Sequence, residues 1–323
     1  MKNRKILKVI LIIITITIVY LAAATIFAEI MFDSLGFIGH FDYESLHKAE
    51  DYGFGSRERD LMTSDGIKIH IYETTLDNPN GVVIMLTGIT GPSVTAFYGQ
   101  AQLVSELGFE AVMVDARGHG LSGGDKISLG VGDIKDVEAV TDYIRKKPGY
   151  EDLPIIVMGL SMGGATAINS GCLNDEISGI IALSPFSSWS DVCVDNVETK
   201  GFPRWVGELF KPGVWIHGFL NHGKDFFVIT PENCIEQAGD TPILIMRSAE
   251  DPIAPLSNQE RLNAHYTGNN MTVVVRDGAW HHVVLEDNIS DPFDDTEYCE
   301  TILTFLKQFI EQETDDNVGR TAI

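Results

Sequence analysis

The sequence predicts an α/β fold with a mostly parallel eight-stranded sheet, helices on both of its faces, and an N-terminal transmembrane helix. Two observations predict the sheet. Apolar runs rich in β-branched residues alternate with segments of helical periodicity, which is typical of parallel strands joined by helices. The runs are almost continuously apolar, as expected for strands that helices cover on both faces. A third observation, a stretch of twenty residues without a charge near the N-terminus, predicts the transmembrane helix.

Residues 1–28 are predicted to form a membrane anchor. The charge-free stretch, residues 9–28, would span about 30 Å as a helix, which is the thickness of the hydrocarbon core of a bilayer. A cleaved signal peptide is the alternative, because Ala22, Ala23 and Ala24 offer a small-residue cleavage site. We favour an uncleaved anchor, because the apolar run is longer than the apolar region of a signal peptide, which has about 7–15 residues.

Charge predicts the topology and limits the partners. Lysines and an arginine precede the apolar run, whereas Glu29 and Asp33 follow it, so we expect a single-pass protein of the cell membrane with a cytoplasmic N-terminus and an extracytoplasmic domain. The formal net charge is −23, which argues against nucleic acid as a partner. The four cysteines lie far apart and lack metal-ligand spacing; in an exported domain they allow up to two disulfides, in three possible pairings.

The main domain is predicted over residues 56–312, after a linker at 29–55 and before a disordered tail at 313–323. Its predicted strands are 58–66, 67–75, 81–88, 109–118, 154–159, 178–186, 241–248 and 271–278. Its predicted helices are 94–108, 133–147, 162–173, 257–265 and 296–313. The alternation of strands and helices is interrupted at residues 190–240. These fifty or so residues are too many for a simple connection, so we interpret them as a lid insertion.

The stretch "GLSMG" places Ser161 between Gly159 and Gly163, directly after a predicted strand. Glycines two before and two after a serine permit a turn too tight for side chains nearby. Such a turn is typical of a nucleophile elbow, in which the serine hydroxyl is presented for attack. A plain Gly-rich turn is the alternative, so the assignment depends on partners elsewhere in the chain.

An acid and a base follow two later strands. Asp251 comes just after the strand at 241–248, and His281 just after the strand at 271–278. In a parallel sheet these loops meet at the edge where the serine lies, and the chain order serine, acid, histidine is that of a hydrolase triad. Glu250 is the alternative acid and His282 the alternative base. We expect Ser161 as nucleophile, Asp251 as the orienting acid and His281 as the base.

The same reaction needs backbone donors for a developing oxyanion. The N–H of Met162, at the start of the helix after the serine, is the first candidate. The second is the N–H of Ile89, in the Gly-containing loop "TGITG" after the strand at 81–88.

The stretches "LTGITG", "DARGHGLSGG", "GLSMGGAT", "EDPIAP" and "GAWHH" together resemble the α/β-hydrolase superfamily, in particular its serine-aminopeptidase-like and lysophospholipase-like branch with membrane-anchored bacterial members. The resemblance implies the α/β-hydrolase fold, an acyl-enzyme mechanism on the Ser-His-Asp triad, and a structural role for His119 in the "RGHG" turn. Two positions depart from the family pattern: the oxyanion loop begins with Thr87 rather than His, and Ser248 stands where Gly is usual.

The insertion is rich in aromatic residues, and we expect Trp205, Phe210 and Trp215 to bind an apolar acyl group or to touch the bilayer surface. Packing of the insertion onto the core is the alternative. The predicted function is hydrolysis of small-molecule or lipid-like carboxylic esters, with no cofactor and no metal, because no phosphate loop, dinucleotide fingerprint or metal cluster is present. A peptidase or acyltransferase on the same triad, or a non-catalytic binding module, are the alternatives.

Overall fold

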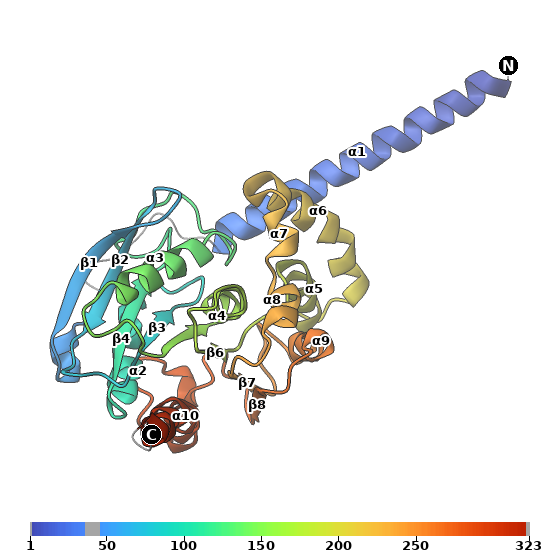
Figure 1. The fold of residues 1–323 in the computed structure, drawn as a ribbon. Coiled ribbons are helices and arrows are strands. Elements are labelled where there is room, and N and C mark those ends of the chain that lie inside the picture. Colours follow the sequence, from blue (N-terminus) through green and yellow to red (C-terminus); the bar gives the residue numbers. More distant parts are fainter. Residues whose placement is uncertain (1, 36–45, 321–323) are drawn as a thin grey trace.

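The computed structural model describes residues 2–35 and 46–320, and its centre is an eight-stranded sheet (Figure 1). The strands are β1 Ser56–Met62, β2 Lys68–Thr74, β3 Gly81–Leu86, β4 Phe109–Asp115, β5 Ile155–Leu160, β6 Gly179–Leu183, β7 Ile243–Ser248 and β8 Met271–Arg276. Their spatial order is β1-β2-β4-β3-β5-β6-β7-β8. Strand β2 is antiparallel to both of its neighbours, and the other strand pairs are parallel. The predicted mostly parallel sheet is confirmed.

Alternating side chains of each central strand enter two different core layers. In β3, Val83 and Met85 pack on the side of α2 (Tyr98–Ser105) and α10 (Thr296–Arg320). Val82 and Ile84 pack on the opposite side, with α3 (Ile134–Arg145) and α4 (Met162–Leu173). Successive side chains of a strand point to opposite faces, so a strand covered on both faces must be apolar at every position.

The strand register brings several loops to one edge of the sheet. Leu86 pairs with Gly159 across β3 and β5, Leu160 pairs with Leu183 across β5 and β6, and Ser248 pairs with Arg276 across β7 and β8. We call the row formed by these carboxyl ends the carboxyl edge. Strand β3 lies between β4 and β5, so the chain reverses its direction of winding there, and α/β proteins bind ligands at such a point.

Helices fill the insertion between β6 and β7. They are α5 Trp189–Thr199, α6 Arg204–His222, α7 Asp225–Val228, α8 Pro231–Cys234 and the 3₁₀ turn η4 Ile235–Gln237. Capping side chains start two of them: Ser188 accepts the N–H of Asp191 at α5, and Thr230 accepts the N–H of Asn233 at α8. The other elements are α9 Ser257–His265 and the 3₁₀ turns η2 Ala49–Tyr52, η3 Val94–Phe97 and η5 Leu285–Asp287.

Helix α1 (Lys2–Leu35) extends away from the rest of the molecule, and its C-terminal part lies beside α6 (Figure 1). Its residues Arg4–Ile30 are long and apolar enough to cross a membrane or to serve as a signal sequence. The helix continues seven residues past the anchor predicted at 1–28, into the predicted linker, because α6 packs against its last turns. Residues 36–45 of that linker lie outside the described residues.

Two other boundaries differ from the sequence-based expectation. Helix α10 continues to Arg320, through most of the predicted tail at 313–323, since adding a residue to an existing helix costs little; residues 321–323 lie outside the described part. The helix expected at 94–108 is a 3₁₀ turn followed by α2, and Gly108 with φ +74° follows its end. All four cysteines are free.

Candidate active site

Ser161 occupies a strained turn between β5 and α4. Its backbone has φ 54° and ψ −113°, a conformation that side-chain-bearing residues rarely adopt. The Ser161 N–H donates to the carbonyl of Leu183 on β6 at 2.8 Å, and the Ser161 carbonyl accepts the N–H of Ala165 at 2.9 Å. The serine side chain is only 9% exposed. The turn therefore fixes Ser161 at the carboxyl edge, at the N-terminus of a buried helix.

The flanking glycines are required by close backbone contacts. A Cβ on Gly159 would lie 2.1 Å from the carbonyl oxygen of Gly163. A Cβ on Gly163 would lie 2.4 Å from the carbonyl oxygen of Leu86 and 2.6 Å from that of Thr87. A larger residue at Gly163 would push the elbow away from the loop after β3, and one at Gly159 would push the end of β5 away from the start of α4.

His281 and Asp251 form a buried hydrogen-bonded pair. The His281 Nδ1–H donates to Asp251, 2.8 Å from Oδ2 and 3.1 Å from Oδ1. The Oδ1 atom also accepts the N–H groups of Ile253 at 2.8 Å and Ala254 at 3.0 Å. With Nδ1 carrying the proton toward Asp251, Nε2 of the neutral ring is left as a proton acceptor.

The environment keeps the Asp251 carboxyl ionised. Burial alone raises its pKa, but the hydrogen bond and charge of His281, together with the N–H groups of Ala254 and Ile253, outweigh burial and lower the pKa below its ordinary value. A carboxylate in this state orients the imidazole and stabilises its positive form.

The alternative acid and base lie elsewhere. The Glu250 side chain is exposed to solvent. The His282 ring turns to the opposite side, where its Nδ1 lies 2.8 Å from the carbonyl oxygen of Asp287. Val283 follows the two histidines in the chain and adopts φ 69°, which is strained for a β-branched residue. The two adjacent imidazoles thus have different partners, Asp251 for His281 and Asp287 for His282.

The two N–H groups expected to form the oxyanion hole have no competing partner. Neither Met162 N–H nor Ile89 N–H donates a hydrogen bond to any residue that the structure describes. The Ile89 carbonyl oxygen lies 3.1 Å from Nε2 of His119. His119 therefore ties the loop after β3 to the turn after β4, a link that the sequence reading of His119 as merely structural did not specify. Within the described residues, Ser161 Oγ and His281 make no hydrogen bond with one another, and such bonds often tighten only when a substrate binds.

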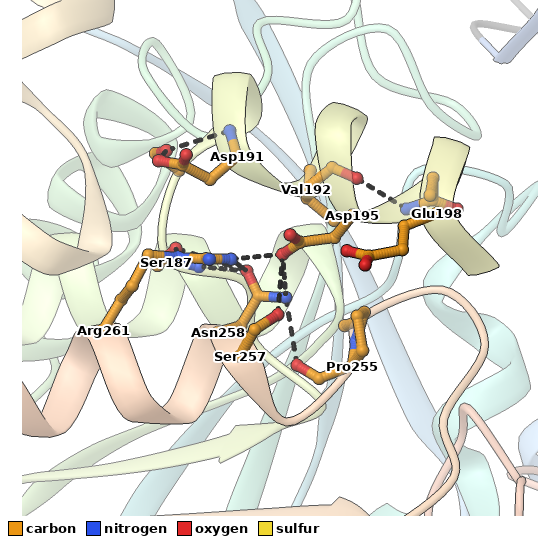
Figure 2. Close-up of polar contacts among 12 residues, drawn as sticks. Ser187, Asp191, Val192, Asp195, Glu198, Pro255, Ser257, Asn258 and Arg261 are labelled. Atoms are coloured by element: carbon orange, nitrogen blue, oxygen red, sulfur yellow. Dashed lines mark hydrogen bonds and ion pairs between the residues drawn. The ribbon is translucent and has the colours of Figure 1, made fainter. Parts of the chain in front are cut away.

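A polar network joins the acid loop to the insertion (Figure 2). The carboxylate of Asp195 on α5 is 2% exposed and pairs with Arg261 of α9. Asn258 donates to the carbonyl of Pro255, in the loop after Asp251, at 3.1 Å, and accepts the N–H of Ser187 at 3.0 Å. Asp195 and Arg261 are 66 residues apart in the chain, and Ser187 and Asn258 are 71 apart, so local sequence reasoning had no signal for these two contacts. The network holds the start of the insertion against the loop that carries Asp251.

The three residues expected to bind substrate do not contact the serine elbow. Trp205 is 63% exposed. Phe210 packs on Phe27 of α1, with ring centroids 4.4 Å apart. Trp215 borders a cavity of about 260 Å³ inside the insertion that contains none of the predicted triad residues. Phe210 thus takes part in the packing of the insertion on α1, whereas a role of the three side chains in substrate binding stays a prediction.

The family model that matches the chain is "Serine aminopeptidase, S33", over residues 77–224, a range that includes Ser161 and the loop after β3 and ends before β7. Among curated proteins, the chain is 25% identical to the uncharacterized protein YqkD of Bacillus subtilis (strain 168), over 74% of this chain and 76% of that protein. It is 23% identical to the alpha/beta hydrolase domain-containing protein WAV2 of Arabidopsis thaliana, over 80% and 81% of the two chains.

A solved structure with the same fold is the Pyrococcus furiosus esterase Pf2001. It superposes with a TM-score of 0.64 at 20% identity, over 82% of this chain and 95% of that one. The eight-stranded sheet, the serine elbow at its carboxyl edge, the matched family model and these relatives agree. The chain therefore has the α/β-hydrolase fold, and over residues 77–224 it is similar to a serine hydrolase family.

Proposed function

We propose that the protein is a membrane-anchored serine hydrolase that cleaves carboxylic esters through an acyl-enzyme. The observation that carries the proposal is the buried His281–Asp251 pair, with Nδ1 2.8 Å from Oδ2, at the same sheet edge as the strained turn of Ser161. A serine hydroxyl is a weak nucleophile unless a base and an orienting acid assist it, and this arrangement supplies both.

In the first half of the reaction, Ser161 Oγ attacks the ester carbonyl carbon and its proton passes to His281 Nε2. The carbonyl electron pair moves to the oxygen, which receives the N–H groups of Met162 and Ile89. Asp251 stabilises the imidazolium without taking its proton. The carbon–oxygen bond to the alcohol then breaks, the alcohol oxygen takes the proton from His281 Nε2, and the acyl group remains on Ser161.

Water completes the cycle. His281 Nε2 removes a proton from a water molecule as its oxygen attacks the acyl carbon, and the same two N–H groups receive the second oxyanion. When this intermediate collapses, Ser161 Oγ regains the proton from His281 and the carboxylic acid leaves. The cycle needs no group beyond the side chains and backbone named here.

The proposed substrate is an ester with an apolar acyl group. The side chains around the insertion are largely apolar, and helix α1 places the insertion beside a candidate membrane span. An ester dissolved in or adsorbed to a bilayer would therefore be enriched near the site. The apolar insertion supports the apolar acyl group. The matched family is named for an aminopeptidase, and the ester is proposed because the Pf2001 neighbour is an esterase.

The test is labelling of the full-length protein in detergent by a fluorophosphonate, which reacts only with an activated serine. Ser161→Ala should abolish both labelling and ester turnover. Ser184→Ala is a matched control, because Ser184 also follows a strand at the carboxyl edge, has φ 44°, and buries a hydroxyl without a partner among the described residues. Retained labelling in Ser161→Ala, or equal loss in Ser184→Ala with both variants folded, would contradict the proposal.

A further inference from the structure

Helix α6 has one buried face and one exposed apolar face. Gly207, Gly213, Val214, His217 and Gly218 are buried. The opposite face exposes Trp205 63%, Leu209 48%, Trp215 43%, Phe219 57% and Leu220 71%. An apolar helix face this large is uncommon on a protein surface that meets only water, and marks a surface that contacts lipid or another protein.

The exposed face carries little charge. Its acidic residue, Glu208, forms an ion pair with Arg204 one turn earlier, at 3.5 Å. Helix α7, which follows, continues the apolar surface with Phe227 and Val228, 41% and 59% exposed. The apolar surface of α6 and α7, which we call the α6 face, thus stands out on a chain whose formal net charge is −23.

The α6 face borders the candidate membrane span of α1. The C-terminal part of α1 lies beside α6 (Figure 1). The Tyr20 hydroxyl donates to the Leu209 carbonyl, and Glu29 lies 2.6 Å from His217 Nδ1, two turns further along both helices. Between these contacts the backbones touch.

The close approach depends on small residues. A Cβ on Gly213 would lie 2.1 Å from the carbonyl oxygen of Ala24, and Ala24 and Ala28 are both buried. Small residues at such a contact are typical of helices that pack together in membranes. Beside the contact, Phe27 of α1 is 44% exposed and packs on Phe210 of α6, so an apolar surface continues from α1 onto α6.

The register of this contact sets the depth of α6. Tyr20 and Ala24 lie inside the charge-free stretch of residues 9–28, about 12 Å and 6 Å before its end along the helix. Gly213, whose backbone meets that of Ala24, must lie at the depth of Ala24, and Phe210 packs on Phe27 nearer the end of the stretch. If α1 spans the bilayer, α6 therefore meets α1 just below the surface of the leaflet on the side of the catalytic domain.

We propose that the α6 face is a lipid-contacting surface, embedded at the boundary between headgroups and acyl chains of that leaflet. Tryptophan at positions 205 and 215 suits this depth, because its ring is apolar and its N–H remains in polar surroundings. The inference rests on the proposed membrane anchor and is independent of the proposed catalysis. Its consequence is that the insertion is fixed to the bilayer by two helices, with α1 crossing it and α6 lying in its surface.

The experiment measures quenching of tryptophan fluorescence by lipids brominated at known depth. The full-length protein is reconstituted in nanodiscs that contain phosphatidylcholine with bromines near the start of the acyl chains. We expect these lipids to quench a large share of the emission, and the double variant Trp205→Phe/Trp215→Phe to lose that quenchable share. Trp280→Phe is the matched control, because Trp280 lies next to His281, away from the α6 face, and should leave the quenchable share unchanged.

Two outcomes would overturn the proposal. If the double variant is quenched as strongly as the wild type, or if the wild type is not quenched, the α6 face is not in lipid. Absence of quenching in discs that hold two copies of the chain would assign the face to a second copy instead. Extraction of membranes with alkaline carbonate separates this failure from failure of the anchor: release of the protein shows that α1 does not span, whereas retention without quenching refutes the α6 face alone. Circular dichroism checks that the variants are folded.

Discussion

Gly163→Ala should impair the site without altering any side chain that reacts. The added Cβ would lie 2.4 Å from the Leu86 carbonyl oxygen and 2.6 Å from that of Thr87, whereas ordinary contact begins at 3.4 Å. The loop after β3 and the elbow must therefore separate by about 1 Å. Both neighbours are backbone atoms, so no flexible side chain can absorb the clash.

The expected effects follow from that displacement. Overpacking of this kind costs about 1–3 kcal/mol of stability, which lowers the melting temperature by several degrees. Because Thr87 begins the loop that carries Ile89, one oxyanion donor moves relative to Ser161, and a misplacement of about 1 Å lowers the rate by up to about 10²-fold.

The assay is turnover of a chromogenic acyl ester together with the melting temperature of the purified protein. Gly55→Ala is the control, since Gly55 has ordinary backbone angles and no atom within 4 Å of an added Cβ. If Gly163→Ala keeps its melting temperature and turns over ester within threefold of the wild type, the tight packing of the elbow against the loop is refuted.

Four further predictions concern the acid, the base and the network beside them. Asp251→Asn should lower kcat for ester turnover by about 10⁴-fold, because an amide no longer stabilises the imidazolium and favours the wrong tautomer of His281. Glu250→Gln should change kcat little. Equal effects of the two substitutions would move the acid to Glu250. His281→Ala should reduce the rate far more than His282→Ala, and the reverse ranking would make His282 the base. The pKa of Asp251 is lowered in the folded protein, so its contribution to stability is full above the unfolded pKa of about 3.9 and is lost as the pH falls through the folded value. The difference in urea midpoint between wild type and Asp251→Asn should therefore shrink only below about pH 4. A difference that is already lost at pH 6 would refute the lowered pKa. Asp195→Ala should cost about 1.5–3 kcal/mol in urea unfolding by leaving Arg261 without its partner, and an unchanged midpoint would show that the network does not hold the insertion in place.

The fold could be predicted from the sequence because its strands are buried on both faces. An apolar residue at each position of Gly81–Leu86 or Ile155–Leu160 is a local signal, and each such run became a strand. The chain order of Ser161, Asp251 and His281 added a second, largely independent signal, because three loops after three parallel strands must meet at one edge.

The sequence could not decide between neighbouring residues. Glu250 and Asp251, like His281 and His282, differ by one position, and only the conformation of the loop sets which side chain turns inward. In the structure, the two N–H groups at Ile253 and Ala254 bind the carboxylate of Asp251, and the strained backbone of Val283 follows the histidines. These features depend on backbone angles that no local pattern predicts.

Contacts between distant segments were also beyond sequence reasoning. The aromatic residues of the insertion were expected to bind an acyl group or touch the bilayer, with packing of the insertion as an equal alternative. In the structure, Phe210 packs on α1, a contact that its periodicity did not indicate. The continuation of α1 to Leu35 likewise depended on the contact between α1 and α6. The aromatic composition predicted that the insertion would be apolar, but not which of its faces would be covered.

The contact between α1 and α6 also determines the order in which the protein can assemble during its synthesis. Glu29 and His217 are 188 residues apart, so at about 5–20 residues per second the ribosome needs roughly 10–40 s to make the second partner after the first. During that interval the nascent α1 has no α6 to cover its small-residue face. Any other membrane helix present in that interval, or a chaperone, competes for the surface formed by Ala24 and Ala28, so maturation of the insertion waits for translation rather than for folding of the sheet.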